Sequence, residues 1–240
     1  MNVARMIGAR LAHESKLLLL DSDRLRGFVQ NAIHEVEFAR WRRAHPCREF
    51  GNKERFAMFE HVAQQSGLLD RPIDYLEFGV HKGFSFRWWV EHNQHADSRF
   101  VGFDTFTGLP EDWIEGLGEG AFDVQGNTPD IDDARVTWKP GLFQDTLPGY
   151  MEQTPPAAAA DNERPLVVHL DADLYSSTLF ALLALLPVMK SGDLVFFDEF
   201  GFSLSYDEFR AWLDAQKAFP TAHEVLARTG PHYRVAIRIK

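Results

Sequence analysis

Cysteine is nearly absent from this sequence of 240 residues: Cys47 is the only one, so no disulfide can form within the chain. Long apolar runs are absent too, because the stretch Leu17–Leu20 is far shorter than the roughly 18 residues that a membrane-spanning helix requires. Charged residues before this stretch interrupt any signal-peptide core. We therefore expect a soluble, cytoplasmic protein with no membrane partner.

Positive charge is also scarce. The chain has 25 lysines and arginines against 35 aspartates and glutamates, which gives a formal net charge of −10 at pH 7. Nucleic-acid binding depends on clustered basic side chains, so the charge balance argues against a nucleic-acid partner. The one basic cluster, residues 40–43 with Arg48, is interpreted as the solvated side of a helix, with a grip on an anionic substrate as the alternative.

The remaining sequence alternates between strand-like and helical patterns, as in a mostly parallel α/β sheet. The expected strands cover residues 73–79, 99–104, 135–139, 166–171, 193–198, 222–227 and 232–239, and the expected helices lie near 84–95, 176–189 and 205–218. The residues Thr229, Gly230 and Pro231 favour a short turn between the last two strands. Seven strands that end in an antiparallel hairpin are typical of the Rossmann-like methyltransferase sheet.

The first 70 residues have a helical character of their own. Apolar residues recur at helical spacing after Leu25, and a second helix is expected after Asn52 with Phe56, Phe59 and Ala63 facing inward. We assign residues 1–70 to an N-terminal helical extension, which either caps the sheet or pairs with another subunit, and residues 71–240 to the catalytic domain. The exposed apolar helix face favours a homo-oligomer, a dimer or larger.

The most informative motif follows the first predicted strand. The segment 76–85 reads LEFGVHKGFS, an acid followed by two glycines that are separated by three residues. Backbone N–H groups at such a turn face an anionic ligand group, and the spacing differs from the G-x-G-x-x-G pattern that binds a pyrophosphate. An acid-x-Gly-x-x-x-Gly loop is typical of S-adenosylmethionine sites, so we predict that the cofactor contacts Glu77, Gly79, Val80, His81, Gly83 and Ser85.

A second acid lies where this motif predicts one. Asp104 ends the strand-like run 100–103 and follows Gly83 by 21 residues, close to the roughly 20 expected for a carboxylate that holds a ribose diol. We predict that Asp104, with Thr105 beside it, contacts the cofactor ribose. The segment from Thr105 to Asp133 is rich in glycine, and a loop this long usually carries function or moves.

Acidic residues also follow two neighbouring strands of the predicted sheet. One strand ends in Asp171 and Asp173, and the next ends in Asp198 and Glu199. Because neighbouring parallel strands lie about 4.8 Å apart, their terminal carboxylates converge, and a hard cation such as Mg²⁺ neutralises such a group. We predict that Asp171, Asp198 and Glu199 hold the metal, with Asp173 in reserve. A bound cation lowers the pKa of an alcohol and orients its oxygen for methyl transfer.

Three further side chains have candidate roles in the reaction. Asp171 is the first candidate to accept the hydroxyl proton, and His81 and His169 are alternatives as general base, although a structural hydrogen-bonding role is the stronger interpretation for each histidine. Ser85 is expected to cap the helix after the glycine loop and to reach the cofactor carboxylate.

Five segments together resemble one known family, the macrocin O-methyltransferase-like (TylF/MycF) enzymes. These segments are LEFGVHKGFS (76–85), GFDTFTGLPE (102–111), GLFQDTLP (141–148), HLDADLYSST (169–178) and LVFFDE (194–199). The resemblance implies a Mg²⁺-dependent enzyme that uses S-adenosylmethionine to methylate a sugar hydroxyl of a natural product.

Residue by residue, the resemblance implies Glu77, Gly79 and Ser85 at the methionine end of the cofactor, Asp104 at the ribose, and Asp171 with the acids at 198 and 199 around the metal. One position departs from the family. A second aspartate usually ends the metal strand, whereas this chain has Glu199, whose extra methylene shifts the carboxylate by about one C–C bond.

Two other functions fit parts of the sequence. A metal-dependent glycosyltransferase would use Asp171-x-Asp173 to hold a sugar nucleotide, but this reading leaves the glycine loop and Asp104 unexplained. A non-catalytic S-adenosylmethionine-binding protein is suggested by Glu199 and by the helical extension. The acceptor is expected to be a small molecule with a free hydroxyl group.

Overall fold

The computed structural model describes residues 23–153, 164–230 and 234–240. Leu17–Leu20 and Pro231, which the sequence arguments used, lie outside the described residues. Across these ranges, no helix is both long enough and apolar enough to cross a membrane. The chain divides into two compact units, Met1–Arg43 and Ala44–Lys240, which are described separately.

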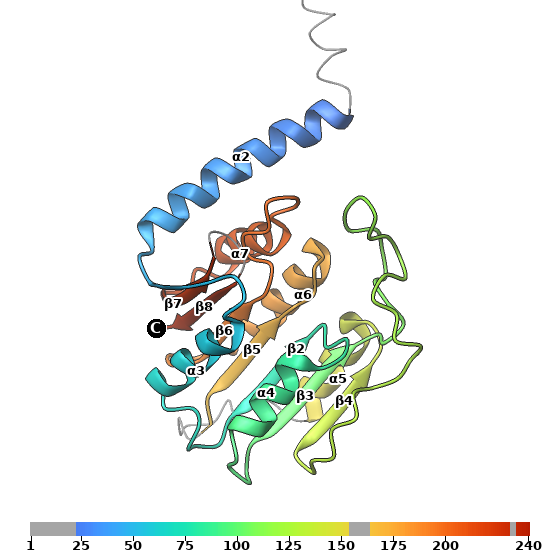
Figure 1. The fold of residues 1–240 in the computed structure, drawn as a ribbon, viewed down its shortest axis with the longest axis vertical. Helices are drawn as coiled ribbons and strands as arrows, with labels where there is room; N and C mark the ends of the chain where they lie inside the picture. Colours follow the sequence, from blue (N-terminus) through green and yellow to red (C-terminus); the bar gives the residue numbers. More distant parts are fainter. Residues whose placement is uncertain (1–22, 154–163, 231–233) are drawn as a thin grey trace, which may run out of the picture. The chain divides into compact units, whose positions relative to one another are not determined.

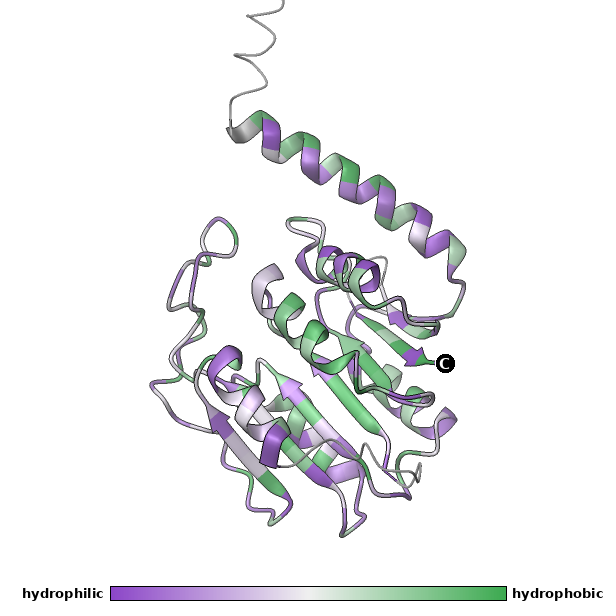
Figure 2. Cartoon of the chain, turned by 180° about the vertical axis from the view of Figure 1, so that it is seen from behind, coloured by the Kyte–Doolittle hydropathy of each residue, from purple (hydrophilic) through white to green (hydrophobic). Residues whose placement is uncertain are grey.

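The described part of the first unit is the helix α2 (Asp23–Ala44), which reaches the first residue of the second unit. The apolar residues expected at helical spacing lie on this helix, and Phe28, Val29, Ile33 and Val36 are exposed. Figure 2 shows apolar and polar residues alternating along α2. The oligomer that this apolar face favours stays a prediction.

The second unit is built on one sheet of eight strands (Figure 1). Its order is β1-β7-β8-β6-β5-β2-β3-β4, and β8 is antiparallel to both of its neighbours whereas the other pairs are parallel. The strands are β1 (Arg48–Phe50), β2 (Asp74–Phe78), β3 (Arg99–Asp104), β4 (Val136–Pro140), β5 (Leu166–Leu170), β6 (Leu194–Phe197), β7 (His223–Thr229) and β8 (Val235–Ile239). The predicted methyltransferase sheet with its C-terminal antiparallel hairpin is therefore confirmed.

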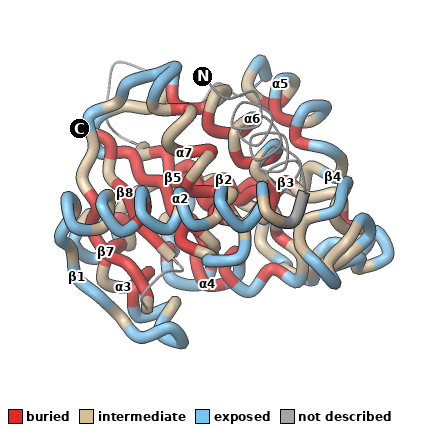
Figure 3. Tube along the Cα trace, turned by 90° about the horizontal axis from the view of Figure 1, so that it is seen from above, coloured by how far each residue is buried: buried red, intermediate tan, exposed pale blue. Residues whose placement is uncertain are grey.

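Helices cover both faces of this sheet (Figures 1 and 2). One face carries α3 (Arg55–Gln65) and α4 (Phe84–His92), and the other carries α5 (Phe143–Gln153), α6 (Tyr175–Leu185) and α7 (Asp207–Ala218). The side chains of a strand alternate between the faces: the ring of Tyr75 contacts Trp89 of α4, whereas Phe78 contacts Phe143 of α5. The central strands are buried along their whole length (Figure 3).

The structure adds to the prediction in three places. The short edge strand β1 pairs in parallel with β7, so the sheet has eight strands where seven were expected. The helix α5 was not predicted, because Pro148 interrupts its sequence pattern. The strand β1 and the helix α3, both inside the expected extension of residues 1–70, belong to the same compact unit as the sheet.

Two local predictions were wrong. Phe56 was expected to face inward on α3, but its side chain is 42% exposed and stacks on Trp88, while Phe59 and Ala63 are buried as expected. Ser85 was expected to cap α4, but the cap position is Gly83, and no side-chain hydrogen bond caps that helix. The left-handed conformation of Gly83, φ +71°, explains why glycine occupies the cap.

Candidate active site

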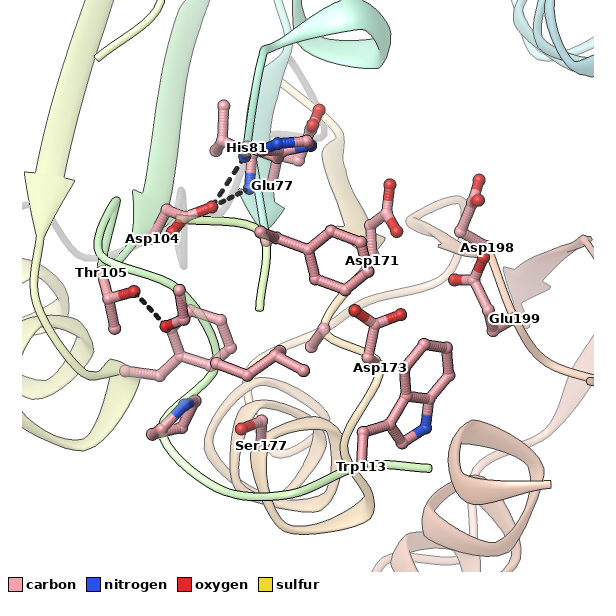
Figure 4. Close-up of a pocket in the computed structure, with 18 of the residues that line it drawn as sticks. Glu77, His81, Asp104, Thr105, Trp113, Asp171, Asp173, Ser177, Asp198 and Glu199 are labelled. Carbon is pink, nitrogen blue, oxygen red and sulfur yellow. Dashed lines mark hydrogen bonds between the residues drawn. The ribbon is translucent and has the colours of Figure 1, made fainter. Parts of the chain in front are cut away.

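A cavity of about 320 Å³ lies at the carboxyl ends of β2, β3, β5 and β6 (Figure 4). Parallel α/β sheets place their ligand sites at this edge. The cavity is lined by every residue that the sequence analysis assigned to the site except Gly83 and His169, and Asp173, the reserve metal ligand, lines it too. Further lining residues come from the segment between β3 and β4, among them Leu109, Pro110, Trp113 and Phe122.

The glycine loop is fixed by close approach to the neighbouring strand. Gly79 has φ +88°, and a Cβ at this position would overlap the backbone carbonyl of Asp171, which follows β5. Gly79 also donates its N–H to the carbonyl of Phe103 at 2.9 Å. The loop therefore needs glycine at position 79 for its own packing, and it brings Glu77 and Asp171 to one cavity.

Asp104 holds this loop in place (Figure 4). Its Oδ2 accepts hydrogen bonds from the backbone N–H groups of Val80 and His81, each at 2.7 Å, and its Oδ1 accepts one from Phe106 at 2.7 Å. The predicted ribose contact stays a prediction, and the structure adds a second role: the carboxylate joins the ends of β2 and β3. Beside it, the hydroxyl of Thr105 donates to the carbonyl of Gly108 at 2.7 Å.

His81 lies in the loop with φ +49°, and its ring contacts Phe122 edge to face at 5.6 Å between centroids. Burial, followed by the charge of Lys82, lowers the pKa of His81 below its usual value. The imidazole is therefore neutral at pH 7, at the wall of the cavity.

Three carboxylates meet on the opposite side of the cavity. One oxygen from each of Asp171, Asp173 and Glu199 lies within 4.8 Å of the other two (Figure 4). Asp173 adopts φ +59°, a conformation that aspartate tolerates better than most residues and that is often found at functional sites. Burial, followed by the charge of Asp171, raises the pKa of Asp173 to about 8. Burial, followed by the charge of Asp198, raises the pKa of Asp171 as well.

Asp198 differs from these three carboxylates because it is hydrogen-bonded to two arginines. Its Oδ1 accepts from Nε of Arg234 at 2.7 Å, and its Oδ2 accepts from Arg234 at 2.9 Å and from Arg55 at 2.6 Å. Burial disfavours the charged form, but the contacts with His169, Arg234 and Arg55 outweigh it, so the pKa of Asp198 lies below its usual value. Asp198 is an ionised carboxylate whose charge the protein itself compensates.

Below the cavity, Glu77 belongs to a buried polar network. Its carboxylate accepts a hydrogen bond from the hydroxyl of Tyr75, which also contacts Nδ1 of His169 at 2.9 Å. Burial lowers the pKa of His169, but the nearby carboxylates of Asp198 and Glu77 have the larger effect and raise it to about 9. The ring therefore carries a proton at neutral pH. His169 is fully buried and faces Glu77 and Asp198, not the cavity.

Glu199 and Glu208 form the end of the acidic cluster. The backbone N–H of Glu199 donates to Oε2 of Glu208 at 2.9 Å, which ties the end of β6 to the first turn of α7. The buried Oε2 of Glu199 has no hydrogen-bond partner among the described residues. Burial, followed by the charge of Asp198, raises the pKa of Glu199. A buried, unpartnered carboxylate oxygen is a position where a cation would be stabilising.

Comparison with known families decides the class of this protein. A family profile described as a methyltransferase domain matches residues 76–200, from β2 through the acids after β6. This match covers more than half of the chain. The chain belongs to this methyltransferase family.

Individual relatives of the methyltransferase are more distant. A stretch of 75 residues is 37% identical to the 8-demethyl-8-(2,3-dimethoxy-alpha-L-rhamnosyl)-tetracenomycin-C 4'-O-methyltransferase of Streptomyces olivaceus, and it covers 31% of this chain but only 25% of that relative. Among solved structures, the calicheamicin methyltransferase CalS11 is 23% identical with a TM-score of 0.59, over 77% of this chain and 80% of its own. The O-methyltransferase NovP is 24% identical with a TM-score of 0.51, over 75% of each chain. These two structures show the same fold.

The sequence analysis of the methyltransferase did not assign Arg55 and Arg234 to the site. Arg55 begins α3, 22 residues before Glu77, and Arg234 follows the hairpin turn. Both lie outside residues 76–200, and neither has a local motif. An arginine at the start of a helix cannot be recognised from the sequence as a site residue, because its partner is known only once the fold is known. The glycine-rich segment after β3 was expected to carry function, and its Trp113 lies at the cavity near Asp173 (Figure 4).

Proposed function

We propose that this chain is an S-adenosylmethionine-dependent O-methyltransferase that acts on a hydroxyl of a sugar unit of a natural product, with Mg²⁺ assistance. The observation that carries the proposal is the single cavity that adjoins both the Gly79–Ser85 loop and the carboxylates after β5 and β6. A methyl donor on the loop side would face an alcohol on the acidic side. The partial match to an enzyme named as a rhamnosyl 4'-O-methyltransferase supports a sugar as the acceptor.

The residues present fit a hard divalent cation. Their ligand atoms are all carboxylate oxygens, and the unpartnered Oε2 of Glu199 is buried beside Asp171 and Asp173. Mg²⁺ takes one or two protein carboxylates and completes its shell with water or substrate, so Asp171 and Glu199 would hold it. Asp198 is assigned a structural role instead, because its two oxygens already accept three hydrogen bonds from Arg55 and Arg234. When bound, the cation would lower the pKa of the acceptor hydroxyl.

Asp173 is the side chain best placed to take the hydroxyl proton. It lines the cavity beside Asp171 and Glu199, within reach of a hydroxyl that a cation on those two side chains would hold. The two histidines are less well placed as general bases. His169 is fully buried beneath the cavity, and His81 lies on the side of the glycine loop, away from the three carboxylates. Asp171, the first candidate from the sequence, is assigned to the metal.

The chain's own residues would also orient the cofactor. Glu77 offers a carboxylate to the cofactor ammonium, and the loop N–H groups and the N-terminus of α4 favour its carboxylate. Trp113 gives the acceptor side a flat apolar wall, which suits the ring face of a sugar. The family match gives no support to a glycosyltransferase or to a binding protein without catalysis.

The proposal is tested by transfer of a labelled methyl group from S-adenosylmethionine to a panel of deoxysugar glycosides and nucleotide-linked deoxysugars, with and without Mg²⁺. We expect a product with one additional O-methyl group, formed faster when Mg²⁺ is present. Transfer of a glycosyl group from a sugar nucleotide, with no methyl transfer, would refute the proposal.

A further inference from the structure

Arg55 is a cation at the wall of a cavity that is lined mostly by acids. Six acids line this cavity, namely Glu77, Asp104, Asp171, Asp173, Asp198 and Glu199, whereas Arg55 and Lys82 are its only lysine or arginine among the described residues. A ligand with a carboxylate therefore has few places where that group is stabilised. Lys82 is exposed, whereas the side chain of Arg55 is 23% exposed.

Two hydrogen bonds fix the position of the Arg55 guanidinium. Its Nη1 donates to Oγ of Ser85 at 2.9 Å, in the first turn of α4, and its Nη2 donates to Asp198 at 2.6 Å. A guanidinium has five N–H donors, so this arrangement leaves donors for a further acceptor. Because both contacts are already made, little side-chain freedom is lost when a ligand binds.

The first turn of α4 points to the same place. The first N–H groups of a helix have no partner within the helix and attract anions, and Ser85 belongs to this turn. The guanidinium therefore adds a fixed positive charge beside backbone donors. This combination fits a carboxylate better than it fits the ammonium, the sulfonium or the adenosine of the cofactor.

We propose that Arg55 binds the carboxylate of the methionine portion of the cofactor, and that helix α3 thereby supplies a residue of the cofactor site from outside the matched methyltransferase segment. The inference rests on the proposed use of S-adenosylmethionine. It also gives Asp198 a definite task, which is to hold the guanidinium in place next to Ser85.

The test compares two ligands by calorimetry on the full chain. S-adenosylhomocysteine carries the amino-acid carboxylate, whereas 5'-methylthioadenosine has the same nucleoside and sulfur but lacks it. Arg55→Met is expected to raise the Kd of S-adenosylhomocysteine by about 10- to 100-fold and to leave that of 5'-methylthioadenosine within about twofold. Arg55→Lys, which keeps the charge but loses the planar fork, is expected to have a smaller effect in the same direction.

Arg234→Met is the matched control, because Arg234 also pairs with Asp198 but does not line the cavity. It is expected to leave the ratio of the two dissociation constants unchanged. Equal weakening of both ligands by Arg55→Met, or the selective loss in Lys82→Met instead, would overturn the assignment. If the unaltered chain binds neither ligand, the proposed function itself fails, which is a distinguishable result.

Discussion

Asp104 offers the sharpest test of how the glycine loop is held. Its two oxygens accept three backbone N–H groups, from Val80, His81 and Phe106, all at 2.7 Å. In Asp104→Asn one oxygen becomes an NH₂ group, which cannot accept and opposes any N–H donor that faces it. If the NH₂ takes the place of Oδ2, the N–H groups of Val80 and His81 both lose their acceptor.

The expected loss of stability follows from these contacts. Hydrogen bonds to charged groups contribute about 1.5–3 kcal/mol each, and water reaches this half-buried site and replaces part of what is lost. We therefore expect Asp104→Asn to lower the free energy of unfolding of the ligand-free chain by about 2–4 kcal/mol. For a domain of this size, such a change corresponds to a fall in Tm of about 4–16 °C.

Urea denaturation of the ligand-free chain, followed by tryptophan fluorescence, measures this difference directly. Asp132→Asn is the control, since Asp132 is an exposed acid of the segment between β3 and β4, and a change within about 0.5 kcal/mol is expected. If Asp104→Asn alters cofactor affinity but leaves the stability of the ligand-free chain unchanged, the carboxylate serves only the ligand, and the structural role is refuted.

Three further predictions follow from the same site. Position 79 has φ +88°, and Gly79→Ala would place a Cβ against the backbone carbonyl of Asp171, so we expect the free energy of unfolding to fall by about 2 kcal/mol or more. A urea titration measures this change, and an unchanged midpoint would contradict the close approach. Asp171→Asn is expected to lower kcat in a methyl-transfer assay by roughly 100-fold or more, while the Kd of S-adenosylmethionine from calorimetry stays within a few-fold. An equal loss of turnover and of cofactor affinity would argue against the assignment. The pKa of Asp173 is about 8 in the folded chain and near 3.8 in the unfolded chain, so its contribution to stability is complete below about pH 4 and is lost as the pH rises to about 8. In a profile of unfolding free energy against pH, measured without divalent cations, Asp173→Asn is expected to flatten the slope between these values. An unaltered slope would contradict the raised pKa.

The sheet could be predicted because its central strands are short, largely apolar runs. β5 and β6 are buried at every position, and such runs are recognisable without knowledge of their neighbours. The strand β1 has only three residues at a sheet edge, and α5 contains Pro148, so neither has a pattern that distinguishes it from a loop. Elements with a strong local pattern were found, and those that depend on their partners were not.

The site shows the same division between local and distant information. The positions of Asp104 and Asp171 at strand ends follow from the sequence, because strands and their ends can be read locally. The pairing of Asp198 with Arg55, 143 residues away, could not be read in this way. The sequence analysis assigned both acids after β6 to the metal, and only the fold shows that Asp198 accepts hydrogen bonds from two arginines. The buried Oε2 of Glu199, by contrast, has no hydrogen-bond partner among the described residues.

A crystal structure of the chain with S-adenosylhomocysteine and Mg²⁺ tests the central claim most directly. We predict that the ligand occupies the cavity with its amino-acid end between Glu77 and Ser85, and that a cation lies between Asp171 and Glu199. A ligand bound elsewhere, with the glycine loop empty and the carboxylates after β5 and β6 turned away from one another, would contradict the account.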